Sequence, residues 1–146
     1  MRRSCCSNAP EWGAKAMQTP KIVSDFRDGL AAGELLVQSC NTCGKPNMWP
    51  RYACPHCQSD DLGWVKSAGG GVLHSFCVLR QGAPEGHESD LPYAIGAVKL
   101  DEGVQILVRL APDGTDDWSG YCCDDRVVFE GKEAGRECAR FRRAAD

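Results

Sequence analysis

The sequence predicts a mainly β protein with a short N-terminal helix, a small metal-binding ribbon and a C-terminal five-stranded barrel. Three observations favour this fold class. Two Cys-x-x-Cys pairs lie close together, alternating apolar residues follow residue 70, and apolar residues at helical spacing precede the first cysteine pair. With 146 residues, the chain is long enough to bury a core without the help of disulfides.

Charge and hydropathy argue against two classes of partner. The chain has 17 Lys and Arg against 20 Asp and Glu, a formal net charge of −3, which does not suit binding to nucleic-acid phosphates by bulk charge. No apolar run reaches the roughly 18 residues of a membrane span. A polar segment, Ser4–Asn8, follows Arg2 and Arg3 where a secretory signal needs an apolar one. We therefore expect a soluble, cytoplasmic protein with no membrane partner.

The N-terminal part of the chain is expected to contain one helix. Residues 1–20 mix polar residues, glycine and proline without a period, and we expect a disordered tail there. From Lys21, the apolar residues recur at helical spacing as far as Leu30, and Gly33 should end the helix. A short strand, Glu34–Gln38, is expected to follow. The predicted first domain, helix plus ribbon, spans residues 21–66.

Four cysteines predict a metal site. Cys40 and Cys43, then Cys54 and Cys57, form two pairs joined by a ten-residue loop, the spacing typical of a Cys₄ zinc site. Four thiolates leave no open coordination position, so we expect a structural Zn²⁺ and no catalytic residue in this group. Iron also suits four sulfurs, while a redox pair or two disulfides fit the spacing and the expected compartment less well. His56, between the last two ligands, is expected to face solvent.

The other six cysteines are interpreted as ordinary thiols. Cys77 lies in the apolar run Val72–Leu79 and is predicted to be a small buried side chain. Cys122 and Cys123 precede a strand, where neighbouring side chains point to opposite faces, so a shared ligand is not expected. No role is assigned to that pair. Three more complete the set, namely Cys5, Cys6 and Cys138.

Residues 67–146 carry the pattern of a small barrel. The predicted strands are Val72–Leu79, Tyr93–Leu100, Val104–Leu110, Val127–Phe129 and Cys138–Arg142, with a tight turn at Asp101–Gly103. Five short strands and one long loop, residues 80–92, favour an OB-type barrel over an immunoglobulin-like sandwich, which needs about seven strands. We interpret Gly69–Gly71 as a hinge between the ribbon and this second domain.

Two functions of different classes follow from the residues themselves. Zinc ribbons and OB barrels commonly bind single-stranded nucleic acid, but the basic residues gather only at the end of the chain, where a solvated strand is the simpler interpretation. They are Arg136, Arg140, Arg142 and Arg143, and the aspartates of residues 113–125 are expected to lie elsewhere. An enzyme acting alone would need an acid–base or nucleophile set. The nearest candidate is a charged loop, interpreted as solvent-exposed, with Glu85, His87, Glu88 and Asp90.

The order of motifs resembles one known family. The motifs are Gly33-Glu34-Leu35, Gln38-x-Cys40-x-x-Cys43-Gly44, Cys54-Pro55-x-Cys57, Trp64, Gly69-x-Gly71-x-Leu73-x-Ser75, Pro92-Tyr93-Ala94-Ile95 and Val98–Val104. They resemble the acyl-CoA-associated proteins that join a rubredoxin-like zinc ribbon to an OB-fold domain of unknown function. The resemblance covers roughly residues 21–143. It departs from the family pattern at Gly120–Cys123 and at Ala139–Phe141, near the end of the barrel.

The resemblance implies a non-catalytic accessory subunit of a CoA-thioester enzyme complex. The implied partner is a dimeric thiolase-like enzyme (thiolase, acyl transferase or aldolase), forming a hetero-oligomer, with a hot-dog-fold enoyl-CoA hydratase as the alternative. Catalytic residues would lie on the partner, and this chain would help to form the acyl-CoA site. A CoA thioester is therefore the implied shared ligand, with no residue assigned to bind it.

Apolar residues of the ribbon leave two interpretations open. Met48–Pro50 and Leu62–Val65 are expected to complete the ribbon sheet. Four side chains are more than a small ribbon can hide, so they either anchor a partner or close the ribbon onto the barrel; they are Leu35, Met48, Trp49 and Trp64. The amphipathic helix could likewise dock on a partner groove.

Overall fold

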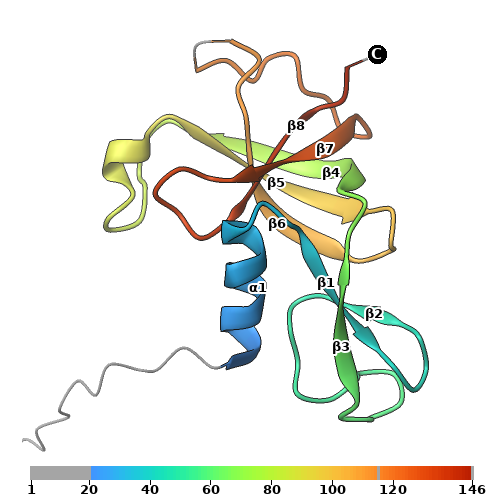
Figure 1. Ribbon diagram of the computed structural model, residues 1–146. Coiled ribbons are helices and arrows are strands. Elements are labelled where there is room, and N and C mark those ends of the chain that lie inside the picture. Colours follow the sequence, from blue (N-terminus) through green and yellow to red (C-terminus); the bar gives the residue numbers. More distant parts are fainter. Residues whose placement is uncertain (1–20, 115, 146) are drawn as a thin grey trace, which may run out of the picture.

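The computed structural model describes residues 21–114 and 116–145, so the predicted tail lies outside the described residues (Figure 1). One helix, a three-stranded sheet and a closed five-stranded barrel follow one another along the chain. The prediction of a mainly β fold with one short helix and a five-stranded barrel is confirmed. Among the described residues, no helix is long and apolar enough to cross a membrane.

Helix α1 (Lys21–Ala31) begins and ends close to its predicted limits. Phe26 and Leu30 lie on one face and are buried. Gly33 adopts a positive φ of 78°, which ends the helix as predicted. Gly29 has a packing role, because a Cβ there would lie 2.6 Å from the side chain of Leu36. The glycine therefore lets the helix lie close against the first strand of the ribbon.

The ribbon sheet has the order β2-β1-β3 and is antiparallel throughout. Its strands are β1 (Leu36–Cys40), β2 (Pro46–Asn47) and β3 (Leu62–Lys66). The predicted strand at Met48–Pro50 is wrong. The Gln38 side chain takes the place of a strand neighbour there, since its Nε2 donates to the Arg51 carbonyl and its Oε1 accepts from the Arg51 N–H, each at 2.9 Å.

The barrel closes in the order β4-β5-β6-β8-β7, with β7 paired to β4. Its elements are β4 (Gly70–Leu79), a 3₁₀ turn η1 (Glu88–Asp90), β5 (Tyr93–Leu100), β6 (Gln105–Leu110), β7 (Arg126–Lys132) and β8 (Ala139–Arg143). Strands β6 and β8 are parallel and the other pairs are antiparallel. This strand order and closure agree with an OB fold.

The glycine run before the barrel is not simply a hinge. Gly70 and Gly71 belong to β4. A Cβ on Gly71 would lie 2.7 Å from the carbonyl oxygen of Lys99 on the neighbouring strand. These glycines therefore allow two barrel strands to approach closely, and only Gly69, with φ of +80°, makes the turn from the ribbon.

Cys77 is exposed, so the prediction that it is buried is wrong. The register of β4 against β5 shifts between Leu73 and Ser75. This bulge reverses the alternation of the strand. As a result, Phe76 and Val78 pack against the core, while the thiol faces outward.

The helix, the ribbon and the barrel share one apolar core. Phe26, Leu30, Leu35 and Val37 belong to the same buried cluster as the barrel interior. Figure 1 shows α1 and β1 reaching the lower end of the barrel side by side. The core residues from the barrel include Leu73, Val98, Ile106, Val108, Val127 and Phe141. The two modules are therefore packed on each other through these side chains.

The segment between β6 and β7 is fastened to the barrel by two aromatic side chains. Trp118 Nε1 donates to the Leu110 carbonyl at 2.9 Å, and Tyr121 Oη donates to the Ala111 carbonyl at 2.6 Å. Both rings are buried. At the point where the sequence departs from the family pattern, Tyr121 thus supplies a firm anchor for the loop.

Candidate functional site

The four cysteines of the ribbon converge on one point. Their Sγ atoms all lie within 4.8 Å of one another, and the Cys40–Cys57 and Cys43–Cys54 sulfurs are each 3.6 Å apart. Four thiolates around a zinc ion, with Zn–S distances of about 2.3 Å, would have sulfurs about 3.8 Å apart. The donor set and its spacing therefore fit a tetrahedral zinc ion.

Two equivalent turns hold these sulfurs. Gly44 N–H donates to the Cys40 carbonyl at 2.8 Å, and Gln58 N–H donates to the Cys54 carbonyl at 2.9 Å. Both turn residues have positive φ, +70° for Gly44 and +62° for Gln58. Glycine adopts positive φ without strain, so the turn at Gly44 has a signal in the sequence. Gln58 carries a side chain, so its residue type gives no such signal.

The turns also stabilise negative charge on sulfur. The backbone N–H of Cys43 lowers the pKa of Cys40. Burial opposes ionisation of Cys54, but the N–H groups of His56 and Cys57 outweigh it and lower the pKa of Cys54 to about 6. One bond of this kind joins His56 N to Cys54 Sγ at 3.4 Å. Cys57 differs, because the lowering effect of the Ser59 N–H is outweighed by burial and the three neighbouring sulfurs, which raise its pKa to about 12. The turns thus favour the thiolate, the form that binds zinc, at Cys40 and Cys54.

The side chains of the remaining candidates do not belong to this ligand group. His56 is exposed. Cys77, Cys122 and Cys123 are exposed, and none of them joins a cluster of potential metal ligands in the described part of the chain. Cys138 is half-buried, and burial raises the pKa of its thiol.

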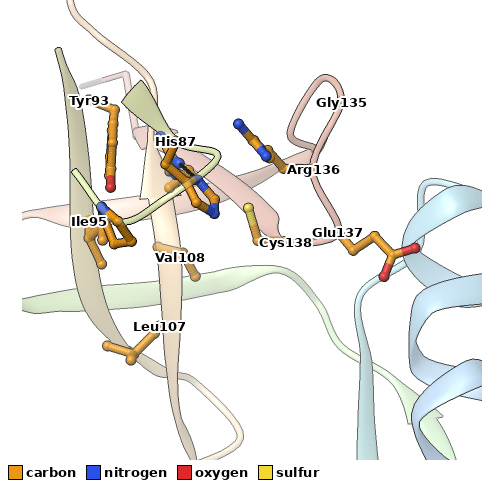
Figure 2. A pocket seen from close by; sticks show the side chains of 11 residues that line it. His87, Tyr93, Ile95, Leu107, Val108, Gly135, Arg136, Glu137 and Cys138 are labelled. Atoms are coloured by element: carbon orange, nitrogen blue, oxygen red, sulfur yellow. Dashed lines mark hydrogen bonds between the residues drawn. The ribbon is translucent and has the colours of Figure 1, made fainter. Parts of the chain in front are cut away.

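A second feature is a cleft of about 580 Å³ on the outer face of β5 and β6 (Figure 2). Tyr93 and Ile95 on β5, and Leu107 and Arg109 on β6, form its floor. One wall comes from the β4–β5 loop and the other from the turn between β7 and β8. The wall residues are Pro84, His87, Gly135, Arg136, Glu137 and Cys138.

An ion-pair cluster centred on Asp90 ties the two walls together. Arg136 donates to both carboxylate oxygens of Asp90, from Nε at 2.8 Å and from Nη2 at 2.9 Å. Arg109 donates to the same carboxylate at 3.1 Å. The hydrogen bond from Arg136 lowers the pKa of Asp90 to about 2, with further help from His87 and the charge of Arg109. The interpretation of this loop as simply solvent-exposed is therefore wrong for Asp90.

Sequence reasoning did not find Arg109. It lies on the outward face of β6, where a charged residue is usually solvated, yet its side chain is 9% exposed. Its Cζ stands 3.5 Å from the ring centroid of Tyr93. The available signal was that Arg109 is the single charged residue in the predicted strand Val104–Leu110.

The basic end of the chain is largely neutralised by carboxylates. Arg140 pairs with Glu130 at 2.9 Å. Arg143 pairs with Asp113 at 3.3 Å and with Asp125 at 3.5 Å. The expectation that the aspartates lie away from these arginines is therefore wrong, because barrel closure brings the loop before β7 against the end of β8.

Comparison with known families matches both parts of this architecture. Residues 27–63 match the rubredoxin-like zinc ribbon domain of ChsH2, and residues 64–128 match the C-terminal OB-fold domain of ChsH2. The chain belongs to the ChsH2 zinc-ribbon and OB-fold family, DUF35. The resemblance read from the motifs is confirmed, and the four-cysteine group lies in the zinc ribbon of this family.

Two curated relatives match part of this ChsH2-family chain. A "probable enoyl-CoA hydratase alpha subunit" of Thermomonospora curvata is 35% identical over 82 residues, which are 54% of this chain and 25% of that protein. A "DUF35 domain-containing scaffold protein" of Methanocaldococcus jannaschii is 31% identical over 72 residues, 49% of this chain and 50% of that protein. The chain thus spans about a quarter and a half of the lengths of these relatives.

Two solved structures share the fold. A chain of the "Ltp2-ChsH2(DUF35) aldolase" has a TM-score of 0.74 and 26% identity, and the match covers 87% of this chain and 98% of that one. A DUF35-family protein of unknown function from Sulfolobus solfataricus has a TM-score of 0.61 and 15% identity, covering 86% and 87%. The second likeness supports the fold alone.

Proposed function

We propose that this protein is a non-catalytic accessory subunit of a CoA-thioester enzyme complex, with a thiolase-like enzyme as its partner. The observation that carries the proposal is the likeness to nearly the whole ChsH2 chain of an aldolase assembly. The scaffold description of the archaeal relative points the same way. We place the complex in the cytoplasm, where exposed thiols such as Cys77 and Cys122 would stay reduced.

The zinc ion has a structural role in this proposal. Cys40, Cys43, Cys54 and Cys57 would hold it, leaving no coordination position for substrate. The metal would fix the loop between β2 and β3, which a small ribbon cannot fold on its own apolar core. Catalysis would then belong to the partner, and a CoA thioester would be bound by both proteins together.

The ribbon offers a surface suited to the partner. Three of the four predicted anchors face inward, since Leu35 is buried and Met48 and Trp64 pack against the core. Trp49 is the predicted anchor that remains exposed. Trp49 is 48% exposed and Tyr52 is 73% exposed. Large aromatic side chains are frequent anchors at protein interfaces, and we infer that these two contact the thiolase-like subunit.

Co-expression tests the proposal directly. The tagged chain is produced together with the proteins encoded by the genes beside its own, and the complex is analysed by affinity capture, size exclusion and CoA-ester turnover. We expect a stable hetero-oligomer, and a loss of affinity of at least about tenfold in a W49A/Y52A double variant. A V65E variant is the control, since Val65 is also exposed but lies on β3, whereas Trp49 and Tyr52 lie in the loop after β2.

A hydratase is the second candidate partner, favoured by the description of the Thermomonospora relative. Capture of a hot-dog-fold hydratase in place of the thiolase-like protein would select this alternative. If neither enzyme is captured and CoA-ester turnover is unchanged by the chain, the accessory-subunit proposal is wrong.

A further inference from the structure

The cleft on β5 and β6 has no role in the proposed function. Its volume of about 580 Å³ lies in the range of pockets that bind small organic molecules. It occupies the second and third strands of the barrel, between the β4–β5 loop and the β7–β8 turn. That face and those two loops form the usual ligand site of OB barrels.

Part of the floor of the cleft is apolar. Ile95 and Leu107 lie along one side in Figure 2, opposite Arg136 and Cys138. Leu107 is 56% exposed, so a large apolar side chain faces the open space of the cleft. An apolar ligand lying on this side chain would remove that surface from water.

Arg109 provides a buried cation at the same site. Its Nη2 donates to Asp90 at 3.1 Å and contacts His87 Nδ1 at 3.3 Å. No hydrogen bond joins its Nε or Nη1 to any residue in the described part of the chain. A buried guanidinium keeps a strong demand for acceptors, and a carboxylate satisfies it with two oxygens.

The walls of the cleft are held before a ligand arrives. Arg136 joins the β7–β8 turn to the β4–β5 loop through Asp90, and its Nη2 also donates to the Gly86 carbonyl at 2.7 Å. Arg27 on α1 pairs with Glu137 at 2.6 Å, which fixes the same turn to the helix. A preformed site loses less affinity to the ordering of loops.

We propose that this cleft binds a small organic anion with an apolar body, such as a medium-chain carboxylate. The carboxylate would pair with Arg109, and the chain would lie along Ile95 and Leu107. The Glu137 carboxylate on the wall of the cleft makes a polyanion such as nucleic acid a poor fit. The site belongs to this chain alone and does not depend on the partner enzyme.

Titration calorimetry and amide NMR on the zinc-loaded full chain test the site, with octanoate as the probe. We expect saturable binding of one octanoate, with shifts at Ile95, Leu107 and Arg109. Octanol lacks the charge and acetate lacks the chain, and each should bind at least about tenfold more weakly. Equal binding of octanol and octanoate would overturn the role of Arg109.

A matched pair of variants localises the binding. L107E places a negative charge in the cleft, and V65E places the same charge on the ribbon at a side chain of similar exposure, 56% against 54%. We expect L107E to weaken octanoate binding at least about tenfold, and V65E to leave it unchanged, with both variants keeping the wild-type circular dichroism. Equal effects of the two variants, or no shifts at the cleft residues, would refute the proposal. The partner is absent from these experiments, so their failure is distinct from a failure to co-purify.

Discussion

At the scale of single residues, the metal ligands differ in their surroundings although they share one chemistry. Cys40 and Cys54 are buried at the start of their turns, while Cys43 and Cys57 are exposed. Each exposed ligand can be replaced without leaving a cavity in the core. This makes them the cleanest positions for testing the metal site.

We expect C43S to lose the metal. A serine hydroxyl is a poor zinc ligand, and three thiolates no longer complete the tetrahedral set. Zinc content measured by plasma mass spectrometry on the reduced protein should fall from about one ion per chain to near zero. The control C122S changes an exposed cysteine outside the group and should keep its zinc. Wild-type protein with less than about half a zinc ion per chain would contradict the assignment.

Asp90 should make stability depend on acid pH. Its pKa is lowered from an ordinary 3.8 to about 2, so the folded chain binds its proton less readily than the unfolded chain. The stabilisation is therefore complete above about pH 4 and is lost as the pH falls through about 2. We expect D90N to have a lower melting temperature than wild type at pH 7. Between pH 4 and pH 2 its melting temperature should fall less than that of wild type, as measured by thermal denaturation. If wild type and D90N lost the same amount of stability between pH 4 and pH 2, the ion pairs of Asp90 would contribute nothing to the stability of the fold.

At the scale of elements, the helix acts as a support for the ribbon. The Phe26 ring lies 5.5 Å from that of Trp49, edge to face, and 6.4 Å from that of Trp64. It is 4% exposed. The sequence allowed the helix to dock on a partner, but the structure shows its apolar face occupied by the ribbon and barrel of its own chain.

We expect F26A to destabilise the protein by about 3 kcal/mol or more, because a large buried ring is replaced by a cavity. Urea denaturation of the zinc-loaded protein measures the change. D28A alters an exposed position on the same helix and should stay within about 0.5 kcal/mol of wild type. A small effect of F26A would mean that the helix is not packed as described.

Elements with a strong local pattern could be predicted from the sequence, and those set by distant contacts could not. The spacing of apolar residues located α1 and β5 almost to the residue. Strand β2 was misplaced, because the Gln38 side chain, rather than a strand, pairs with Arg51. The orientation of Cys77 was missed because a bulge carries no sequence signal as clear as alternation.

The two candidate sites differ in the same way, since one is encoded by a local sequence pattern and the other by contacts between distant segments. The cysteine spacing predicted a metal group because its ligands are close in sequence and chemically distinctive. The cluster of Asp90, Arg109 and Arg136 combines three segments brought together by barrel closure. Charged residues at such positions have the same appearance in sequence as solvated ones, so local reasoning could not find this group.

At the scale of the whole molecule, the shared core joins the ribbon and the barrel into one folding unit. We expect zinc removal to weaken both together. Chelation should lower the melting temperature of the zinc-loaded protein, with ribbon and barrel probes following a single transition. Amide NMR signals of β1 and β3 report on the ribbon, and those of β5 and β6 report on the barrel. Two separate transitions, with an unchanged barrel after chelation, would show that the modules fold independently.

The position of β8 between β6 and β7 has a consequence for synthesis on the ribosome. The last strand of the described chain is the one that closes the barrel. Until residues 139–143 have left the ribosome, β6 and β7 must each wait with one side unpaired. The turn that carries Arg136 is likewise in place only after this strand has docked. A nascent chain therefore presents the finished surface of the barrel only after β8 has been synthesised and has docked, and assembly with a partner through that surface should follow this step.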